Sequence, residues 1–438
     1  MPMLDKTLLV EKCSPKARAG ALATAVLAAL LLGACATPSE SGPSESGPAA
    51  SNPAAATTGI RHSVHPGPVA TVRVAFDRDG VTASRAHGVA DLDSGREVTA
   101  DSPTRMASIS KLVMAIGVMR MVEAGQLDLD ADVSAGLGWT LRHPQFPDAP
   151  ISLRQLLSHT SGLTDDAGYW QTPLDGQYRE LVQDPQAWNA TQAPGTWFQY
   201  ANANFPLVAA VMENATGERF DLLMQRLVFE PLQLSACYGW AACDDATVAS
   251  AVVQYDASRK PIADNNQGGR PGCPVARASD GSCDLSLWRP GANGALFGPQ
   301  GGMRISANDL AKIGRLLLGG GEVDGVRLLT EASVEELLRP QWTLADTGGS
   351  TDRGFYCTYG LSSHTLATTH ADCHDDPFGD GVRRVGHAGD AYGLRSGLWV
   401  DRDAGTGVVY FATGMTDAPT GDSAFTAIEE TLAQDRPL

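Results

Sequence analysis

The sequence predicts an α+β fold, built either as one large unit with insertions or as two or three domains. Hydrophobic residues make up 43% of the 438 residues and charged residues 19%, so the chain has ample apolar material for a large core. β-rich runs joined by turns lie near both ends of the globular region, and strongly apolar helical segments lie between them. The net charge of −17 argues against nucleic acid as a partner, because binding phosphates requires a basic surface.

The first 34 residues predict an export signal that is not part of the fold. Basic residues precede an apolar run over residues 19–32, which is too short to span a bilayer. The run ends in Leu-Gly-Ala-Cys at residues 32–35, which looks like a bacterial lipobox and implies that Cys35 is the lipidated first residue of the mature protein. A plain signal peptide cut nearby, with Cys35 incidental, is the alternative.

Residues 35–58 predict a tether between this anchor and the rest of the chain. They are mostly Pro, Ser, Gly, Ala and Thr, and such a segment buries too little apolar surface to offset its conformational entropy. We therefore expect a globular domain over residues 59–438. The whole protein is expected to be exported and held to the bacterial envelope by its lipid alone, at the periplasmic side of the outer membrane in a Gram-negative cell.

Six of the eight cysteines lie beyond the export segment and predict disulfides. An even number of cysteines in an exported chain is typical of a disulfide framework, although six allow 15 connectivities. We expect the pairs that are nearest in sequence, which are Cys237 with Cys243, Cys273 with Cys283, and Cys357 with Cys373. A metal site is the alternative, but none of these pairs has the two-residue spacing of a zinc knuckle. We expect neither a metal nor a cofactor.

The globular region begins with a predicted hairpin followed by a buried helix. The runs 69–76 and 81–89 are rich in β-formers, and the Asp-Arg-Asp-Gly sequence between them is a turn signal. The next segment, from Met106 to Met119 and closing at Gly125, is apolar on every side except at Lys111, so it predicts a helix in the middle of the structure. A lysine there is costly unless it lines a cleft and has polar partners.

Ser108 and Lys111 are the first candidates for chemistry. A spacing of three residues places both side chains on one face of the helix, with the serine at its start. The helix dipole and the free N–H groups favour a serine nucleophile there, and the lysine can take up its proton. A four-residue pattern is weak evidence alone, since a capped helix with a snorkelling lysine gives the same sequence.

Two further segments carry polar residues beside apolar elements. Residues 194–204 form a predicted loop with Tyr200 and Asn202, and an apolar helix follows from Phe205. Residues 385–393 surround His387 with glycines, which would let backbone approach a ligand closely. Two β-runs, 396–400 and 407–413, and a closing helix over 424–433 complete the chain.

In chain order, Ser108-x-x-Lys111, Tyr200-x-Asn202 and His387-x-Gly389 resemble the three signature elements of the β-lactamase-related serine hydrolases. That family includes class C β-lactamases, DD-carboxypeptidases, D-aminopeptidases and esterases. The resemblance runs from about Pro68 to the C-terminus. It is supported by the stretches 156–163 and 300–306 and by the predicted helix 309–318.

The resemblance implies a β-lactamase/transpeptidase-like fold, in which an antiparallel β-sheet is flanked by helices and a mostly helical second lobe. The active site would lie at the junction of the two lobes. Ser108 would be the nucleophile, and Lys111 and Tyr200 would activate it by shared proton transfer.

The resemblance also assigns substrate-binding roles. Asn202 would orient the substrate amide and the lysine, and His387 and Gly389 would lie along the cleft. The backbone N–H groups of Ser108 and Asp390 would form an oxyanion hole. His159 and Ser161 are read as structural loop residues, and the polar stretch 256–286 as an insertion that shapes or covers the site.

The third signature element, His387-x-Gly389, indicates which substrates the resemblance favours. Class C β-lactamases carry Lys-Thr-Gly there, whereas His387 is mostly neutral at pH 7. This disfavours efficient β-lactam hydrolysis and favours a D-amino-acid peptide or a carboxylic ester as substrate. A weak β-lactamase and a non-catalytic lipoprotein that binds cell-wall peptides remain alternatives. The expected partner is a small-molecule or peptide substrate, and the oligomeric state is left open.

Overall fold

The computed structural model of the protein describes residues 67–415 and 421–437. The expected signal peptide over 1–34, the lipidated Cys35 and the linker to residue 58 lie outside these described residues, as do the first residues of the expected domain. Within the described ranges, no helix is both long and apolar enough to cross a membrane.

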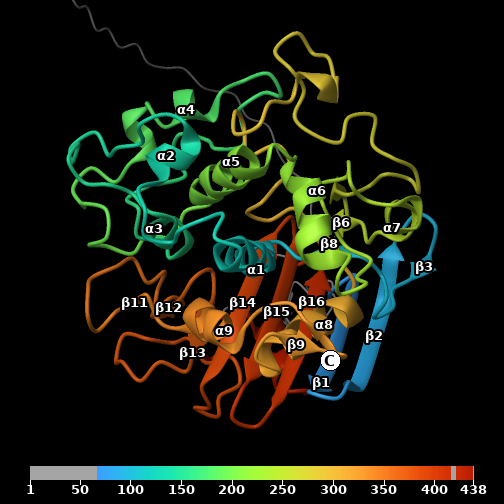
Figure 1. Ribbon diagram of the computed structural model, residues 1–438. Coiled ribbons are helices and arrows are strands. Elements are labelled where there is room, and N and C mark those ends of the chain that lie inside the picture. The colour runs from blue at the N-terminus through green and yellow to red at the C-terminus, as the bar shows by residue number, and fades with distance from the viewer. Residues whose placement is uncertain (1–66, 416–420, 438) are drawn as a thin grey trace, which may run out of the picture. The chain divides into compact units, whose positions relative to one another are not determined.

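A nine-stranded antiparallel sheet is the centre of the fold, in the order β11-β12-β13-β14-β15-β16-β1-β2-β3. Its strands are β1 (Ala70–Asp77), β2 (Val81–Asp91), β3 (Arg96–Glu97), β11 (Trp342–Thr343), β12 (Thr358–Tyr359), β13 (His364–Leu366), β14 (Arg384–Ala391), β15 (Leu394–Asp401) and β16 (Thr406–Thr413). The first strand pairs with the last, with Val72 opposite Phe411. Figure 1 accordingly shows blue β1 beside the red C-terminal strands.

Helices cover both faces of this sheet. The helix α8 (Ala307–Leu318) packs on β1, β15 and β16, and α10 (Ala427–Ala433) packs on β15 and β16. Alternate residues of β16 belong to different cores: Val409 and Phe411 pack in the large core with α8, whereas Val408 and Tyr410 pack with α10. Because successive strand residues point to opposite faces, the two helices lie on opposite sides of the sheet.

A mostly helical lobe lies beyond α1 (Ile109–Glu123), which sits between this lobe and the sheet (Figure 1). Its helices α2 and α3 both pack on α5. The lobe and its connections contain α2 (Val133–Leu137), α3 (Leu153–Leu157), α4 (Tyr178–Leu181), α5 (Asn204–Thr216), α6 (Phe220–Met224), a π-helical turn (Gln225–Phe229), α7 (Asp245–Ser250) and short 3-10 turns at Pro185–Ala187 and Leu285–Leu287. The helix α9 (Glu331–Leu338) packs on α1.

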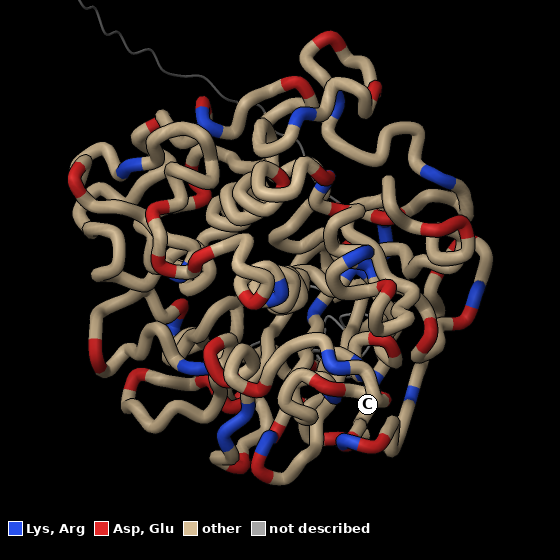
Figure 2. Tube along the Cα trace, in the orientation of Figure 1, with Lys and Arg blue, Asp and Glu red and all other residues tan. Residues whose placement is uncertain are grey.

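Three small sheets complete the architecture. One joins β4 (Thr104–Arg105), β8 (Met303–Ile305) and β5 (Cys237–Tyr238), and it anchors the start of α1. The others pair β6 (Gln254–Tyr255) with β7 (Pro261–Ala263) and β9 (Glu322–Val323) with β10 (Val326–Arg327). Acidic and basic positions are interspersed over the loops and strand ends (Figure 2).

The expected elements are present with small shifts at their ends. The predicted hairpin is β1 and β2, and the buried helix is α1, in which every residue from Ile109 to Met119 is buried. This helix begins three residues later than expected, because Ala107 has a positive φ of 46° that no helix interior allows. The fold class predicted from the sequence is confirmed.

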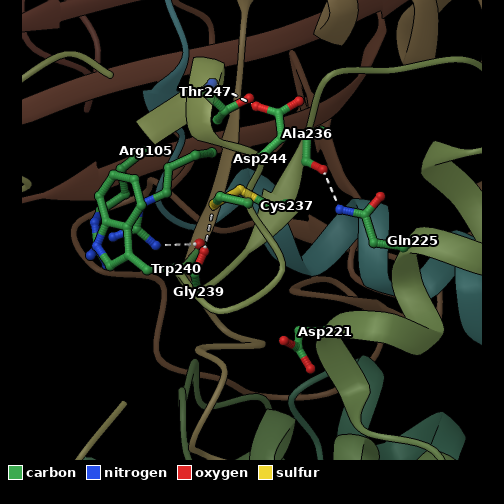
Figure 3. The surroundings of a disulfide bond; sticks show 12 residues. Arg105, Asp221, Gln225, Ala236, Cys237, Gly239, Trp240, Asp244 and Thr247 are labelled. Carbon is green, nitrogen blue, oxygen red and sulfur yellow. Dashed lines mark hydrogen bonds between the residues drawn. A yellow bond between two sulfur atoms is a disulfide. The ribbon is translucent and has the colours of Figure 1, made fainter. Parts of the chain in front are cut away.

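The three disulfides join the pairs expected from their spacing: Cys237–Cys243, Cys273–Cys283 and Cys357–Cys373. Figure 3 shows the first of them, with Gln225 donating a hydrogen bond to the carbonyl of Ala236 just before it. This disulfide closes the loop that leads out of β5, and Trp240 lies within that loop.

Candidate active site

A cavity of about 710 Å³ brings together five of the seven residues proposed for catalysis and substrate binding. Its wall comes from the start of α1, the loop before α5 and the end of β14. The five residues are Ser108, Tyr200, Asn202, Gly389 and Asp390. Lys111 and His387 are buried directly behind this wall, and their side-chain contacts show what each one can do there.

The backbone holds Ser108 at the N-cap of α1, directly before Ile109, where it lines the cavity. The preceding Ala107 is strained at φ 46°, and such strain persists only where surrounding contacts enforce it. Ser110 supplies two of these contacts, since its hydroxyl donates to the Ala107 carbonyl (2.6 Å) and accepts from the N–H of Met303 in β8 (3.0 Å). The turn therefore fixes Ser108 at the N-terminal, positive end of the helix dipole.

Lys111 is fully buried and its ammonium group donates three hydrogen bonds. The acceptors are Ser108 Oγ (2.9 Å), Asn202 Oδ1 (2.8 Å) and the carbonyl of Gln300 (2.6 Å). Burial lowers the pKa of Lys111 to about 7, and the negative charge of Asp165 only partly opposes this. A large fraction of Lys111 is thus neutral near pH 7, and its amine can then accept the Ser108 proton.

Tyr200 lies against the same serine in an aromatic stack. Its ring lies between those of His159 (4.2 Å between centroids) and Tyr356 (4.8 Å). Its buried hydroxyl makes no hydrogen bond within the part of the chain that the structure describes. Burial raises the pKa of Tyr200, although the nearby Ser108 hydroxyl opposes this. Tyr200 is therefore protonated at neutral pH and has a hydroxyl free to donate.

Asp165 fixes the orientation of Asn202. One oxygen of this carboxylate accepts from Asn202 Nδ2 (2.9 Å), and the other accepts from the N–H of Ala203 (2.9 Å). Since Asn202 Nδ2 is used in this way, Oδ1 must face Lys111. The sequence analysis missed Asp165, and the only available signal was an Asp-Asp pair just after the supporting stretch 156–163.

His159 and Ser161 support the loop that carries Tyr200. His159 Nδ1 accepts from the N–H of Ala201 (3.0 Å), and the Ser161 hydroxyl donates to Asn204 Oδ1 (2.5 Å). Burial, and after it the charge of Lys111, lowers the pKa of His159 well below its usual range. These contacts agree with the structural roles expected for both residues.

His387 does not extend into the cavity, although the sequence placed it along the cleft. Only 1% of it is exposed, and its Nδ1 lies against the carbonyl of Ala388. Because a carbonyl can only accept, Nδ1 carries the proton, and Nε2 accepts from the Tyr359 hydroxyl (2.7 Å). Burial, with Lys111 nearby, holds the pKa of His387 well below its usual range, so the ring is neutral.

The residues after His387 form the sheet edge of the cavity. β13 pairs with β14 only as far as Gly386, so none of the strands in the described part of the chain pairs with the next five residues of β14 on that side. A Cβ at Gly389 would lie 2.5 Å from the Met106 carbonyl oxygen and 2.3 Å from Ser396 Oγ. Only glycine lets β14 approach the turn before Ser108 this closely. The Asp390 side chain pairs with Arg395.

The polar insertion 256–286 was expected to shape or cover the site, and it does not cover the cavity, because none of the described wall residues comes from it. It reaches the wall through Asp264, which binds Arg105 (3.0 Å). Among the described residues, no three His, Cys, Asp or Glu side chains are grouped closely enough to hold a metal ion.

A comparison with known proteins identifies the family of this chain. The profile described as Beta-lactamase matches residues 61–433. Esterase EstB of Burkholderia gladioli is 29% identical over 44% of this chain and 52% of its own length. Penicillin-binding protein 4 of Amycolatopsis lactamdurans is 26% identical over 65% of this chain and 70% of its own. The match thus spans about half the length of the esterase.

The fold is shared with solved structures as well. The D-amino acid amidase of Ochrobactrum anthropi, solved in complex with D-phenylalanine, superposes with a TM-score of 0.57 at 19% identity. The superposition covers 84% of this chain and 93% of the amidase. At this identity the likeness concerns the fold alone.

Proposed function

Because the chain belongs to the Beta-lactamase family, we propose that it is a serine hydrolase that cleaves an ester or an amide through an acyl intermediate on Ser108. The observation that carries this proposal is the hydrogen bond between Ser108 Oγ and a buried Lys111 whose pKa is about 7. A general base is most effective when its pKa lies near the working pH.

The contacts support the following sequence of steps. Neutral Lys111 takes the Ser108 proton as the serine oxygen attacks the substrate carbonyl. The negative oxygen that forms is stabilised by the N–H groups of Ser108 and Asp390, a contribution of about 3–4 kcal/mol per donor in other hydrolases. Tyr200 passes its proton to the leaving group and is reprotonated by the Lys111 ammonium, so that Lys111 is neutral again and can accept a proton from the water that releases the acyl group.

We propose a carboxylic ester or a D-amino-acid peptide as the substrate. The buried, neutral His387 provides no fixed charge where class C β-lactamases carry a lysine, which weighs against efficient β-lactam hydrolysis. The similarity to an esterase and a penicillin-binding protein agrees with both substrate classes. A weak β-lactamase, or a binder of cell-wall peptides without turnover, are the alternatives.

A fluorophosphonate probe tests the catalytic assignment directly. We expect it to label the wild type and Ser235→Ala, which alters an exposed serine outside the cavity, but not Ser108→Ala. Turnover of 4-nitrophenyl butyrate, a D-Ala-D-Ala peptide and nitrocefin then ranks the substrate classes. Equal labelling of Ser108→Ala would show that the nucleophile is another residue. Peptide binding without labelling would favour the non-catalytic alternative.

A further inference from the structure

Arg105 lines the cavity three residues before Ser108, on β4. Its side chain is 19% exposed. Its Nε and Nη2 donate to the two oxygens of Asp264, at 3.2 Å and 3.0 Å. Its Nη1 has no hydrogen-bond partner within residues 67–415 and 421–437. The guanidinium is thus held from behind and keeps donors available on the cavity side.

The Asp264 carboxylate is shared between two arginines, because it binds Arg304 as well as Arg105. Arg304 Nη2 donates to Asp264 Oδ1 at 2.6 Å, and both side chains are only 2% exposed. The two arginines lower the pKa of Asp264 to about 2, and the pKa of Arg304 is about 10. All three groups are therefore charged at pH 7, and the triad carries a net charge of +1.

Of the two arginines, only Arg105 can present this excess charge to a ligand. Arg304 is turned into the protein, where it donates to the Gly302 carbonyl (2.8 Å) and lies 4.0 Å from the Trp240 ring centroid. Trp240 belongs to the loop closed by the Cys237–Cys243 disulfide, and Figure 3 shows Arg105 and Trp240 on the same side of that disulfide. The cross-linked loop thus supports the triad from behind.

The other arginines of the cavity wall each have their own carboxylate. Arg395 pairs with Asp390, with Glu429 also nearby. Arg353 is 83% exposed and lies 3.9 Å from Asp352. Among the described residues of the wall, Arg105 is therefore the cation whose charge is least compensated.

We propose that Arg105 forms an anion subsite in this cavity and selects substrates that carry a carboxylate. This inference rests on the proposed function and narrows its substrate class to esters or amides with a free acid group. The ring of Tyr392 lies over one face of the Arg105 guanidinium, with its centroid 5.0 Å from the guanidinium carbon. The N–H groups at the edge of the guanidinium remain available to bind a carboxylate.

The subsite is distinct from the position of the third motif. Ala391, the last residue of β14, lies four residues beyond His387, which corresponds to about 13 Å along an extended strand, and Tyr392 follows it in the turn. A carboxylate bound at Arg105 therefore occupies another part of the cavity than one bound near His387. The acid group can belong to the acyl part or to the leaving group, and matched esters separate these cases.

The experiment compares kcat/KM for a carboxylate-bearing ester with that for its methyl-capped neutral analogue. Mono-(4-nitrophenyl) adipate places the acid on the acyl part, and 3-carboxy-4-nitrophenyl pentanoate places it on the leaving group. We expect the wild-type kcat/KM to be at least about tenfold higher for one of the two acidic esters than for its neutral analogue. One bidentate hydrogen-bonded pair between an arginine and a carboxylate provides a preference of this size. Arg105→Gln should lose this preference, Arg105→Lys should keep part of it, and the control Arg353→Gln should keep it fully.

A measurement on wild type alone covers the case in which Arg105→Gln does not fold. Adipate should inhibit neutral-ester hydrolysis at least about tenfold more strongly than adipamide, and the difference should shrink in about 0.5 M salt. Equal inhibition by both compounds, or an acid preference that survives in Arg105→Gln, overturns the proposal. Normal turnover of neutral esters would then leave the serine hydrolase assignment intact, whereas absent labelling by fluorophosphonate counts against that assignment instead.

Discussion

Replacing Asp165 with asparagine tests whether Lys111 is the group that must lose a proton. Asp165 holds Asn202, and Asn202 accepts a hydrogen bond from Lys111 (2.8 Å). The carboxylate favours the charged ammonium, and it is the one cause that raises the pKa of Lys111 against burial. Without this charge the ammonium is less stable, so the pKa of Lys111 falls below about 7.

The size of the shift follows from the geometry. The hydrogen bonds on either side of the Asn202 amide, 2.8 Å and 2.9 Å long, place the two charges roughly 7 Å apart. At an effective dielectric constant of about 20, their attraction is about 2.4 kcal/mol. At about 1.4 kcal/mol per pKa unit, its loss lowers the pKa of Lys111 by roughly 1–2 units.

The pH dependence of kcat/KM measures this shift. If neutral Lys111 is the base, the wild-type rate rises through an apparent pKa of about 7 and then reaches a plateau. In Asp165→Asn the rise should move to lower pH by roughly 1–2 units. The plateau should fall by about tenfold to a hundredfold, because the asparagine offers one acceptor oxygen where Asp165 offers two, one to Asn202 and one to Ala203. Asp166→Asn, which alters the exposed neighbour, serves as the control.

Two results would refute the reasoning. If the plateau of kcat/KM falls but the apparent pKa of its rise stays the same, Lys111 either does not set the pH dependence or is not coupled to Asp165. A rate that falls, instead of rising, as the pH passes through about 7 would show that the active form is the ammonium. Either result requires another general base.

The remaining predictions concern four other parts of the chain. His387→Gln should leave the rise in rate near pH 7 unchanged, because the His387 pKa already lies well below its usual range; a shifted rise in the pH–rate profile would contradict this. Gly389→Ala should lower kcat/KM by at least about tenfold with a native circular dichroism spectrum, because the added Cβ meets backbone at 2.5 Å; wild-type activity would argue against this close approach. Lys111→Ala and Tyr200→Phe should each lower kcat by orders of magnitude, and the double variant should be little worse than either, since both act in one proton-transfer unit; additive losses would separate their roles. Mass spectrometry of the membrane-extracted protein should find a lipid on Cys35, and a mature N-terminus elsewhere would contradict the lipobox interpretation.

Features that depend on nearby residues were predictable from the sequence. The spacing of Ser108 and Lys111 places both on one helix face, and in the fold Lys111 Nζ lies 2.9 Å from Ser108 Oγ. The cysteine pairs were predictable because their loops are short. The apolar surroundings of Lys111 indicated a buried lysine with polar partners, which is what the fold contains.

Features that depend on distant residues were not predictable. Asp165 and Arg105 act through Asn202 and Asp264, which are 37 and 159 residues away in the chain. No periodicity or spacing links such positions, because only the folded chain brings them within hydrogen-bond distance. For the same reason the sequence could not decide whether the insertion 256–286 shapes the site or covers it, whereas in the fold its Asp264 binds the wall residue Arg105 and none of the described wall residues comes from the insertion.

The sequence by itself determined the fold class, the helix that presents Ser108 and the residue types of the proposed catalytic group, because helix and strand periods and short spacings are local properties. The tertiary structure decided how those groups are charged and where they point. Burial brings the pKa of Lys111 to about 7, and the packing of β14 turns His387 toward Tyr359 and away from the cavity. Desolvation and orientation depend on every neighbour that surrounds a side chain, and the fold supplies most of those neighbours from distant parts of the chain.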